Sequence, residues 1–424
     1  MSAVRPKSAW KAILTRAAVA SVLLLWTSFA QAQAISERGF VDGRGVWFPQ
    51  EAPNDTTRVI GDLLFREEVF LKPTPTPWIQ FAAGLDLRAN SHDQVEDRWR
   101  FDFSDRGTLR PRMAIRRLTA TITASKLTLD VGKQFIRWGR ADILNPTDRF
   151  APRDYLNVID ADFLPVLGVR PVLRLGNDTI EAVWIPRLTP SRLPLFDQRW
   201  AVFPAALQGV PIVDGGSVIP ERSQQGVRWN HTGGRIEGSL SFFDGFNHLA
   251  NIEGSLLPLG NGVKLTRTFP DLRSYGGDVG IPLPAFMLKG EAAYFTSPSS
   301  SSDEYVLYVI EIERQIGEWL IDVGYAGEAV TKSTGTFPFA PDRGMAKSII
   351  GRVSYTVDPR KTVAVEGAAH QNGKGFYVKG EFSDAIAAHW RVTVNGVGIS
   401  GDSEDFLGQF SHNSHLAAGL RFSF

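Results

Sequence analysis

The chain of 424 residues contains no cysteine. This absence excludes disulfides, thiolate catalysis and cysteine-ligated metal sites. Beyond its first segment the chain also lacks any apolar run of about 18 residues, the length that a membrane-spanning helix needs. None of the seven histidines lies in a zinc-protease motif or near a Gly-x-Ser-x-Gly elbow. Helical membrane proteins and the common hydrolase classes are therefore disfavoured.

Residues 1–32 have the three parts of a secretory signal peptide. A basic start (Arg5, Lys7, Lys11 and Arg16) precedes a short apolar run over 17–29, and Ala30-Gln31-Ala32 is a small-x-small cleavage site. The alternative is an uncleaved anchor. Cleavage after Ala32 removes four positive charges, which takes the formal net charge from +1 to about −3. Export and this acidic balance disfavour nucleic-acid binding.

Residues 415–424 alternate strictly between apolar and polar or small side chains. Leu416, Ala418, Leu420, Phe422 and Phe424 share one side, and His415, Ala417, Gly419, Arg421 and Ser423 share the other. A tilted strand of this length spans the hydrocarbon layer of a bilayer. We expect an outer-membrane β-barrel strand, with Phe422 and Phe424 as the C-terminal signal for the barrel-assembly machinery.

The same period of two recurs along the chain, most clearly at 79–88, 127–132, 235–242, 319–326, 363–370 and 386–394. Weaker segments lie near 39–48, 60–70, 112–122, 170–176, 179–186, 225–231, 271–281, 285–295, 304–313, 346–357 and 375–383, which makes about eighteen strands. Short turns alternate with long loops, as in outer-membrane barrels. The short connection near 371–374 breaks this alternation, so sixteen strands is the alternative.

These patterns predict an all-β protein, a transmembrane antiparallel up-and-down β-barrel in the bacterial outer membrane. Residues 33–38 are expected to form a short periplasmic tail, and 39–424 the barrel with its extracellular loops. Tryptophans near strand ends suit interfacial girdles, with core packing as the alternative: Trp47, Trp78, Trp184, Trp229 and Trp319. The expected surroundings are outer-membrane lipid and lipopolysaccharide.

Positive charge concentrates between Arg98 and Arg153, where eleven Arg and two Lys face five Asp. Arginines in a pore select anions and hold carboxylates in a two-pronged grip. The candidates for solute contact in this region are Arg110, Arg112, Arg116, Arg137, Arg140 and Arg153. The alternatives are outward arginines that bind lipopolysaccharide phosphates, and ion pairs with nearby acids. Arg116 and Arg117 are adjacent, so a regular strand cannot point both inward.

Two long segments are candidates to fill the lumen. Residues 187–224 contain five prolines among apolar residues, which disfavours a regular helix or strand. A loop of this length folds inward or caps the outer mouth. Residues 137–169 are the second candidate.

The segment Gly132–Asp148 carries the most distinctive motif. Trp138 and Gly139 suit an aromatic side chain packed against a sharp bend, and Asn145-Pro146 starts a turn. The segment Gly132–Asp148, which includes Asp142 and Asp148, resembles the Gly-x-Gln, Trp-Gly and Asn-Pro-x-Asp pattern of a group of porin-like proteobacterial outer-membrane proteins related to alginate-export-type barrels. This resemblance implies a barrel and transport. The motif either braces the inner wall or places Arg137, Arg140, Asp142 and Asp148 in contact with solute.

We therefore expect a channel for passive or weakly selective diffusion of small hydrophilic solutes, with a preference for anions and with no cofactor and no metal. Asp402, Glu404 and Asp405 offer calcium ligands, but such a charge run is usually solvated. The alternatives are a barrel enzyme, such as a lipid or ester hydrolase, and a non-conducting structural or assembly barrel.

Overall fold

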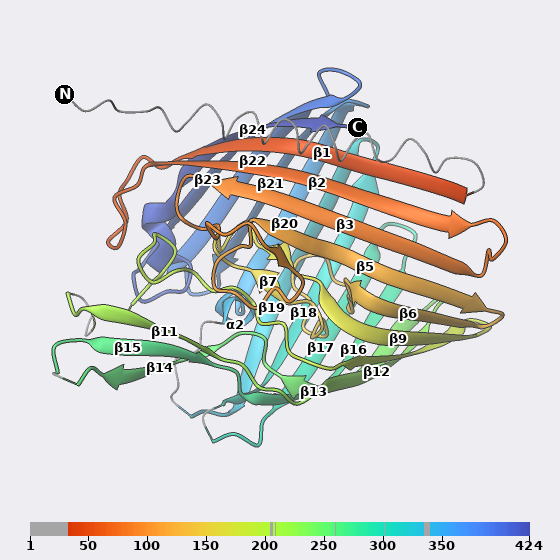
Figure 1. The fold of residues 1–424 in the computed structure, drawn as a ribbon, viewed down its shortest axis with the longest axis horizontal. Helices are drawn as coiled ribbons and strands as arrows, with labels where there is room; N and C mark the ends of the chain where they lie inside the picture. Colours follow the sequence, from red (N-terminus) through yellow and green to blue (C-terminus); the bar gives the residue numbers. More distant parts are fainter. Residues whose placement is uncertain (1–32, 204–206, 208, 259, 301, 335–339) are drawn as a thin grey trace, which may run out of the picture.

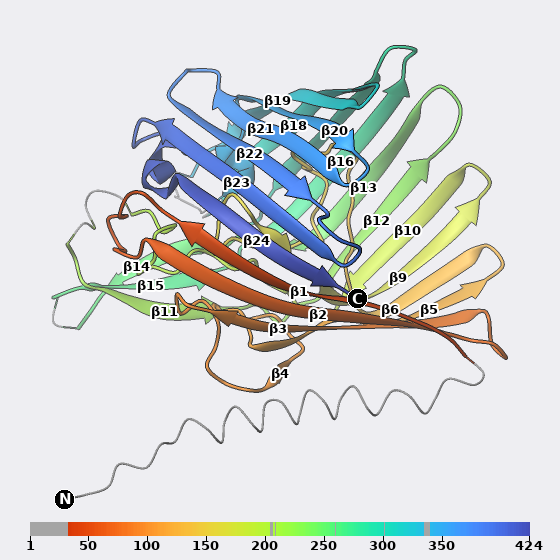
Figure 2. The same cartoon turned by 90° about the horizontal axis from the view of Figure 1, so that it is seen from above.

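The computed structural model describes residues 33–424 except 204–206, 208, 259, 301 and 335–339, so the expected signal peptide lies outside the described residues. The chain forms a closed antiparallel barrel of eighteen strands, as the sequence predicts. β1 (Gln33–Trp47) pairs with β2 (Val59–Pro73) on one side and with β24 (His415–Ser423) on the other, which closes the barrel (Figure 2). A two-residue strand, β4 (Phe101–Asp102), adds to β5 (Met113–Ala124) in parallel.

The barrel strands are β1 (Gln33–Trp47), β2 (Val59–Pro73), β3 (Ile79–Asn90), β5 (Met113–Ala124), β6 (Leu127–Gln134), β9 (Val166–Leu175), β10 (Asp178–Ile185), β12 (Gln224–His231), β13 (Glu237–Phe246), β16 (Asp271–Pro282), β17 (Met287–Thr296), β18 (Glu304–Ile316), β19 (Trp319–Lys332), β20 (Ser348–Asp358), β21 (Lys361–His370), β22 (Gly375–Asp384), β23 (Trp390–Gly401) and β24 (His415–Ser423). The loops hold β4 (Phe101–Asp102), β7 (Arg153–Asp154), β8 (Asp162–Phe163), β11 (Ile212–Val218), β14 (Asn251–Leu256), β15 (Val263–Thr268), α2 (Pro341–Gly344) and the 3-10 helix η2 (Gly408–Asn413). Within the described part of the chain, no helix has the length and hydrophobicity to cross a bilayer.

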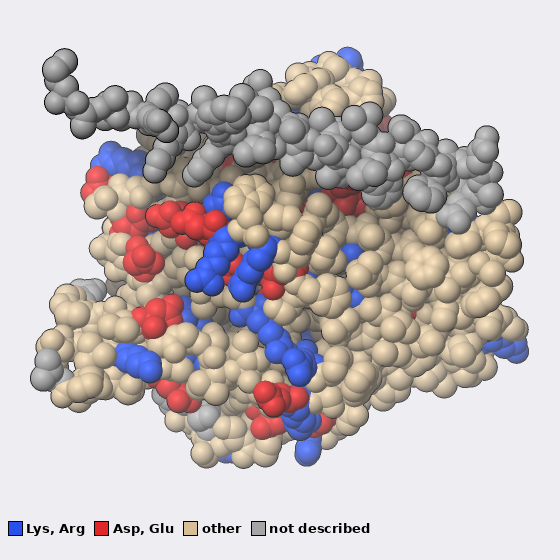
Figure 3. Space-filling view, viewed as in Figure 1, with Lys and Arg blue, Asp and Glu red and all other residues tan. Residues whose placement is uncertain are grey.

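The alternation in the sequence becomes an apolar outer surface and a polar inner one. On β18, Ile310 and Ile312 are 54% and 44% exposed, whereas Glu311 between them is fully buried. A water-soluble protein rarely exposes so many large apolar side chains. The face of the molecule over β3 and β5, toward the short-turn rim, carries few charged side chains (Figure 3). This distribution fits a barrel whose outer wall contacts lipid.

The expected tryptophans are exposed at both ends of the strands. Trp47 and Trp184 lie near the long-loop rim, and Trp78 and Trp319 lie at the short-turn rim. Trp229, also exposed, lies toward the short-turn end of β12. Amphipathic rings at both rims match the two interfaces of a bilayer. Packing in a core, the alternative for these residues, does not occur at any of the five positions.

Short turns lie at one rim and long connections at the other (Figure 1). The connection 371–374 lies at the long-loop rim although it is short, because β21 and β22 form a simple hairpin. Sixteen strands, the alternative count, is therefore wrong. The last internal strand begins at Trp390, later than the expected 386, because residues 385–389 form the preceding turn.

Residues 33–38 do not form the expected tail. They are the first part of β1 and pair in register with the end of β2, from Glu68 to Pro73. The physical reason is that β2 extends to Pro73 and offers backbone partners over its whole length.

Candidate solute pathway

The connection between β6 and β9, residues 135–165, folds into the barrel and packs along its inner wall. The indole N–H of Trp138 donates to Glu181 on β10 at 2.7 Å. The guanidinium of Arg140 donates to Asp278 on β16 at 3.0 Å and to Glu237 on β13 at 2.8 Å. We name residues 135–165 the internal segment. These contacts fix it against several strands that lie far apart in sequence.

A single carboxylate on β17 anchors the motif of this segment. Glu291 accepts the backbone N–H groups of Arg140 at 2.8 Å, Ala141 at 3.1 Å and Thr147 at 2.9 Å. Gly139 has φ +100°, and a Cβ at this position would lie 2.7 Å from a carboxylate oxygen of Glu291. Only glycine allows the chain to approach the wall so closely. The Trp-Gly pair therefore has a structural explanation.

The Asn-Pro turn places Asp148 in a buried position. Asp148 donates its backbone N–H to the carbonyl of Asn145 at 3.1 Å, on the other side of Pro146. Its carboxylate accepts the Arg137 guanidinium and the Trp138 backbone N–H. Burial raises the pKa of Asp148 to about 6, although the Arg137 charge and these hydrogen bonds oppose the shift.

Apolar side chains fill the space between the internal segment and the wall. Trp138 packs edge-on against Phe150 with ring centroids 4.9 Å apart, and Phe150 packs against Phe243 of β13. Leu144 joins a second buried cluster with residues of β19, β20 and β21. One side of the lumen is therefore packed like a protein core.

A second carboxylate joins three long loops. Asp154 accepts Arg110 through two hydrogen bonds of 2.9 and 3.0 Å, and it accepts Arg192 at 3.2 Å. Arg192 also donates to Asp105 at 2.8 Å. Burial opposes ionisation of Asp154, but the two guanidinium groups outweigh it and hold its pKa below the ordinary range. Loops 91–112 and 186–223 are thus tied to the internal segment.

The connection 186–223 divides into two parts. Arg199 is buried and donates to the carbonyls of Gln50 at 2.9 Å, Thr57 at 2.5 Å and His412 at 3.0 Å. With Arg192 it holds the first part across the mouth. The second part contains β11, which pairs with β15 in a small sheet with β14 that stands away from the barrel (Figure 1). The segment therefore both crosses the mouth and extends outside it.

An open cavity of about 650 Å³ remains on the other side of the lumen. It lies between residues 157–162 of the internal segment and the wall formed by β1–β3 and β22–β24. We name it the side passage. Its basic lining residues are Arg44, Arg88, Arg110, Lys379, Arg391 and Arg421, and its acidic ones are Asp42, Asp62, Asp160, Asp162 and Glu381.

Several of these acids are neutralised by bases of the wall. Asp160 accepts Arg44 at 2.6 Å and Lys379 at 2.7 Å, and these charges outweigh burial and lower its pKa to about 2. Arg421 pairs with Asp42 at 2.6 Å. Arg391 donates to the hydroxyl of Ser383 at 2.9 Å and has no acidic partner within the described residues. Bases therefore outnumber acids along the side passage by one.

The structure separates the arginines that the sequence singles out. Arg110 lines the side passage, and it also lines a smaller cavity of about 30 Å³ together with Arg116. Arg116 and Arg117 both lie over the ring of Phe135. Arg112 pairs with the exposed Asp97 on an outer loop.

The remaining predicted residues belong to the internal segment. Arg137 pairs with Asp148, Arg140 binds the wall, and the guanidinium of Arg153 lies 4.3 Å from the centre of the Phe163 ring. Asp142 contacts Lys289 of β17. In the acidic run after β23, Asp405 accepts His370 at 2.6 Å and caps the Leu407 backbone N–H.

Five bases of the side passage were absent from the sequence-based candidates: Arg44, Arg88, Lys379, Arg391 and Arg421. Each lies on a barrel strand and points inward. The signal that could have found them is the period of two, because Arg88, Arg391 and Arg421 occupy the polar side of predicted strands. They lie outside the Arg98–Arg153 cluster in the sequence, so the charge count of that cluster did not identify them.

No protein-family model and no curated protein sequence matches the chain. Its fold is similar to that of a BenF-like porin from Pseudomonas fluorescens Pf-5, with a TM-score of 0.53, 10% identity, and coverage of 92% of this chain and 98% of that one. It is also similar to OccAB4 from Acinetobacter baumannii (0.53, 12%, 93% and 98%) and to OpdQ from Pseudomonas aeruginosa (0.52, 10%, 93% and 98%). At this identity the likeness shows the fold alone, a closed antiparallel β-barrel.

Proposed function

We propose that this chain is an outer-membrane channel through which small hydrophilic solutes diffuse passively, with a preference for anions. The side passage carries this proposal, because it is polar, lies inside the barrel and has bases along its length. The structurally similar BenF-like protein is a porin by name, which supports a channel. An eighteen-stranded barrel is wide enough to leave an aqueous passage beside a packed segment.

The bases lie at successive levels of the passage. Arg88 and Arg110 lie toward the long loops, Lys379 lies in the middle of β22, and Arg391 and Arg421 lie near the short turns. Arg110, Lys379 and Arg421 are paired with acids, so the charge of Arg391, which has no acidic partner among the described residues, is the main support for a preference for anions. Because the acids Asp42 and Asp160 are already paired with bases, they repel an anion less. The excess of one base over the acids of the side passage supports the proposed preference for anions.

Reversal-potential recordings of the purified protein in planar bilayers test this proposal. In a potassium chloride gradient the sign of the potential reports which ion passes more easily. We expect the sign that indicates preferential passage of chloride. A cation preference would refute the anion part of the proposal, and the absence of any conductance step in protein-containing bilayers would refute the channel itself.

A further inference from the structure

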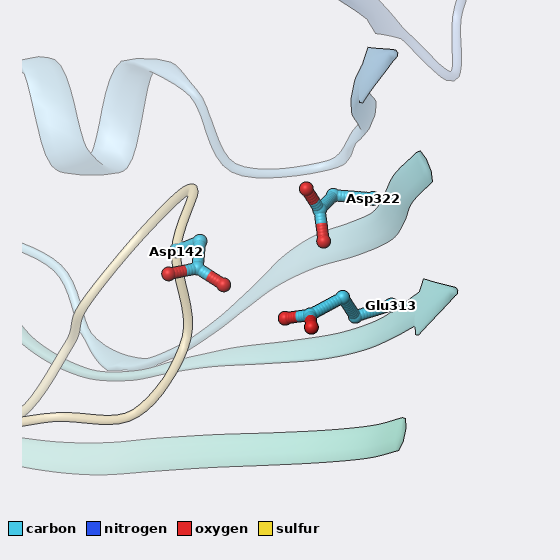
Figure 4. A group of neighbouring side chains, drawn as sticks. All are labelled: Asp142, Glu313 and Asp322. Atoms are coloured by element: carbon cyan, nitrogen blue, oxygen red, sulfur yellow. The ribbon is translucent and has the colours of Figure 1, made fainter. Parts of the chain in front are cut away.

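A group of carboxylates lies on the inner wall near the short-turn rim, apart from the side passage. Asp142 comes from the internal segment, Glu313 from β18 and Asp322 from β19 (Figure 4). One oxygen of each lies within 4.8 Å of one oxygen of the other two. The three carboxyl groups point toward a common space (Figure 4).

This group is electrostatically incomplete. Glu313 and Asp322 stand directly opposite each other on neighbouring strands, and like charges in this register repel. Asp322 is only 6% exposed, and its Oδ1 atom has no hydrogen-bond partner among the described residues. A buried carboxylate oxygen without a partner is rare in native proteins. A bound water or a cation would supply the missing partner.

The neighbouring bases leave a negative excess. Lys289 contacts Asp142, and it lies 2.5 Å from Glu313 and 3.3 Å from Glu311. Arg352 stands opposite Asp322 in register but donates to Glu366 instead. Lys289 contacts three of the four carboxylates, and the formal charge of the four acids and this one lysine is about −3. A divalent cation would reduce this excess to about −1.

We propose that Asp142, Glu313 and Asp322 bind one divalent cation, with calcium preferred over magnesium. Oxygens that lie up to 4.8 Å apart can all contact one ion at the calcium–oxygen distance of about 2.4 Å. Calcium accepts irregular sets of six to eight oxygens, whereas magnesium requires a near-octahedral set. Three carboxylates together with water molecules supply such an irregular set of oxygens. The ion would fasten the internal segment, through Asp142, to β18 and β19.

Calorimetric titration with calcium chloride tests the site. A chain of residues 33–424 is refolded in detergent from inclusion bodies, which removes lipopolysaccharide phosphates, and is dialysed against a chelator. We expect one ion per chain with a dissociation constant of about 0.1–1 mM. Asp322→Asn and Asp142→Asn should each weaken binding at least about tenfold, because each removes a charged ligand. Asp142 lies on a loop with an exposed side chain, so its variant tests the site even if the Asp322 variant does not fold.

Two further variants complete the test. Asp97→Asn removes an exposed acid on an outer loop, far from this group, and it should bind calcium as the unmodified protein does. Lys289→Met removes the competing ammonium and should tighten binding. The proposal is overturned if no saturable heat appears below about 10 mM calcium, if both Asp142 and Asp322 variants bind normally, or if the lysine variant binds more weakly.

Discussion

Arg391→Gln should lower the anion preference of the channel without disturbing its fold. Arg391 lines the side passage near the short-turn rim, and among the described residues its side chain hydrogen-bonds only the hydroxyl of Ser383. Glutamine keeps a donor for that hydroxyl and removes one positive charge. No acid loses an ion-pair partner, so the substitution leaves no unpaired buried charge. The change in ion selectivity therefore reports the electrostatics of the passage alone.

The size of this effect follows from Coulomb's law. An ion that passes about 6 Å from a unit charge in water interacts with it by about 0.7 kcal/mol. Screening at physiological ionic strength, with a Debye length of about 8 Å, reduces this energy to about 0.3 kcal/mol. Because the anion loses this attraction and the cation loses an equal repulsion, the permeability ratio should fall about threefold.

The assay is the reversal potential in a potassium chloride gradient, recorded for both proteins under the same conditions. Arg112→Gln is the matched control, because Arg112 lies on an outer loop beside Asp97 and does not line the side passage. It should leave the ratio unchanged. Equal ratios for Arg391→Gln and the unmodified protein, or equal shifts in both variants, would refute the assignment of the side passage as the ion path.

Three other predictions concern the packed side of the lumen and the chain that crosses the mouth. Gly139→Ala should destabilise the protein by about 2–4 kcal/mol, because it combines a positive φ with a clash against Glu291; Gly176→Ala, with φ +69° and open space around it, measures the backbone cost alone, and equal losses in thermal melts would contradict the close-approach argument. Asp148→Asn tests the pKa of about 6 that burial gives Asp148. Because this pKa is raised, the stabilising contribution of Asp148 is complete below about pH 4 and is lost as the pH rises through about 6. Melting temperatures of the variant and of the unmodified protein are compared at each pH. The stability of the variant relative to the unmodified protein should increase between about pH 5 and pH 7.5, by about 1–3 kcal/mol. A difference that does not change with pH would contradict the buried state of the carboxyl group. Arg199→Met should release the chain that crosses the mouth and raise single-channel conductance. Arg222→Met should not, because it loses contacts at the rim alone: ion pairs to Asp244 and Asp271, a hydrogen bond to the Gly245 carbonyl and a contact with the Phe246 ring. Identical conductance in the two variants would exclude a narrowing role for the chain that Arg199 holds.

The barrel was predictable because the side chains of a strand between lipid and water alternate between apolar and polar with a period of two residues. All eighteen expected segments correspond to barrel strands, with errors only at ends such as 33–38 and 386–389. Periodicity is weak at such ends, since the pattern does not show how far a neighbouring strand extends. Pairing of the first residues of β1 with Glu68–Pro73 depends on β2, and that partner lies far away in sequence.

The lumen was less predictable, because ion pairs depend on the path of the loops. Asp154 meets Arg110 and Arg192 across 44 and 38 sequence positions. No local pattern indicates that these charges neutralise each other. The charge count of the region around Arg110 therefore overstated the number of free arginines. Arg391, in contrast, was placed correctly on the polar side of a strand, but a single arginine did not stand out.

The internal segment packs against one part of the wall, whereas Ser383, Arg391 and Arg421 make their side-chain hydrogen bonds within the wall itself. In the proposed channel, permeability and folding are therefore separable traits. An engineer can exchange side chains at these positions to install a new solute preference while the scaffold that holds the lumen in shape stays intact.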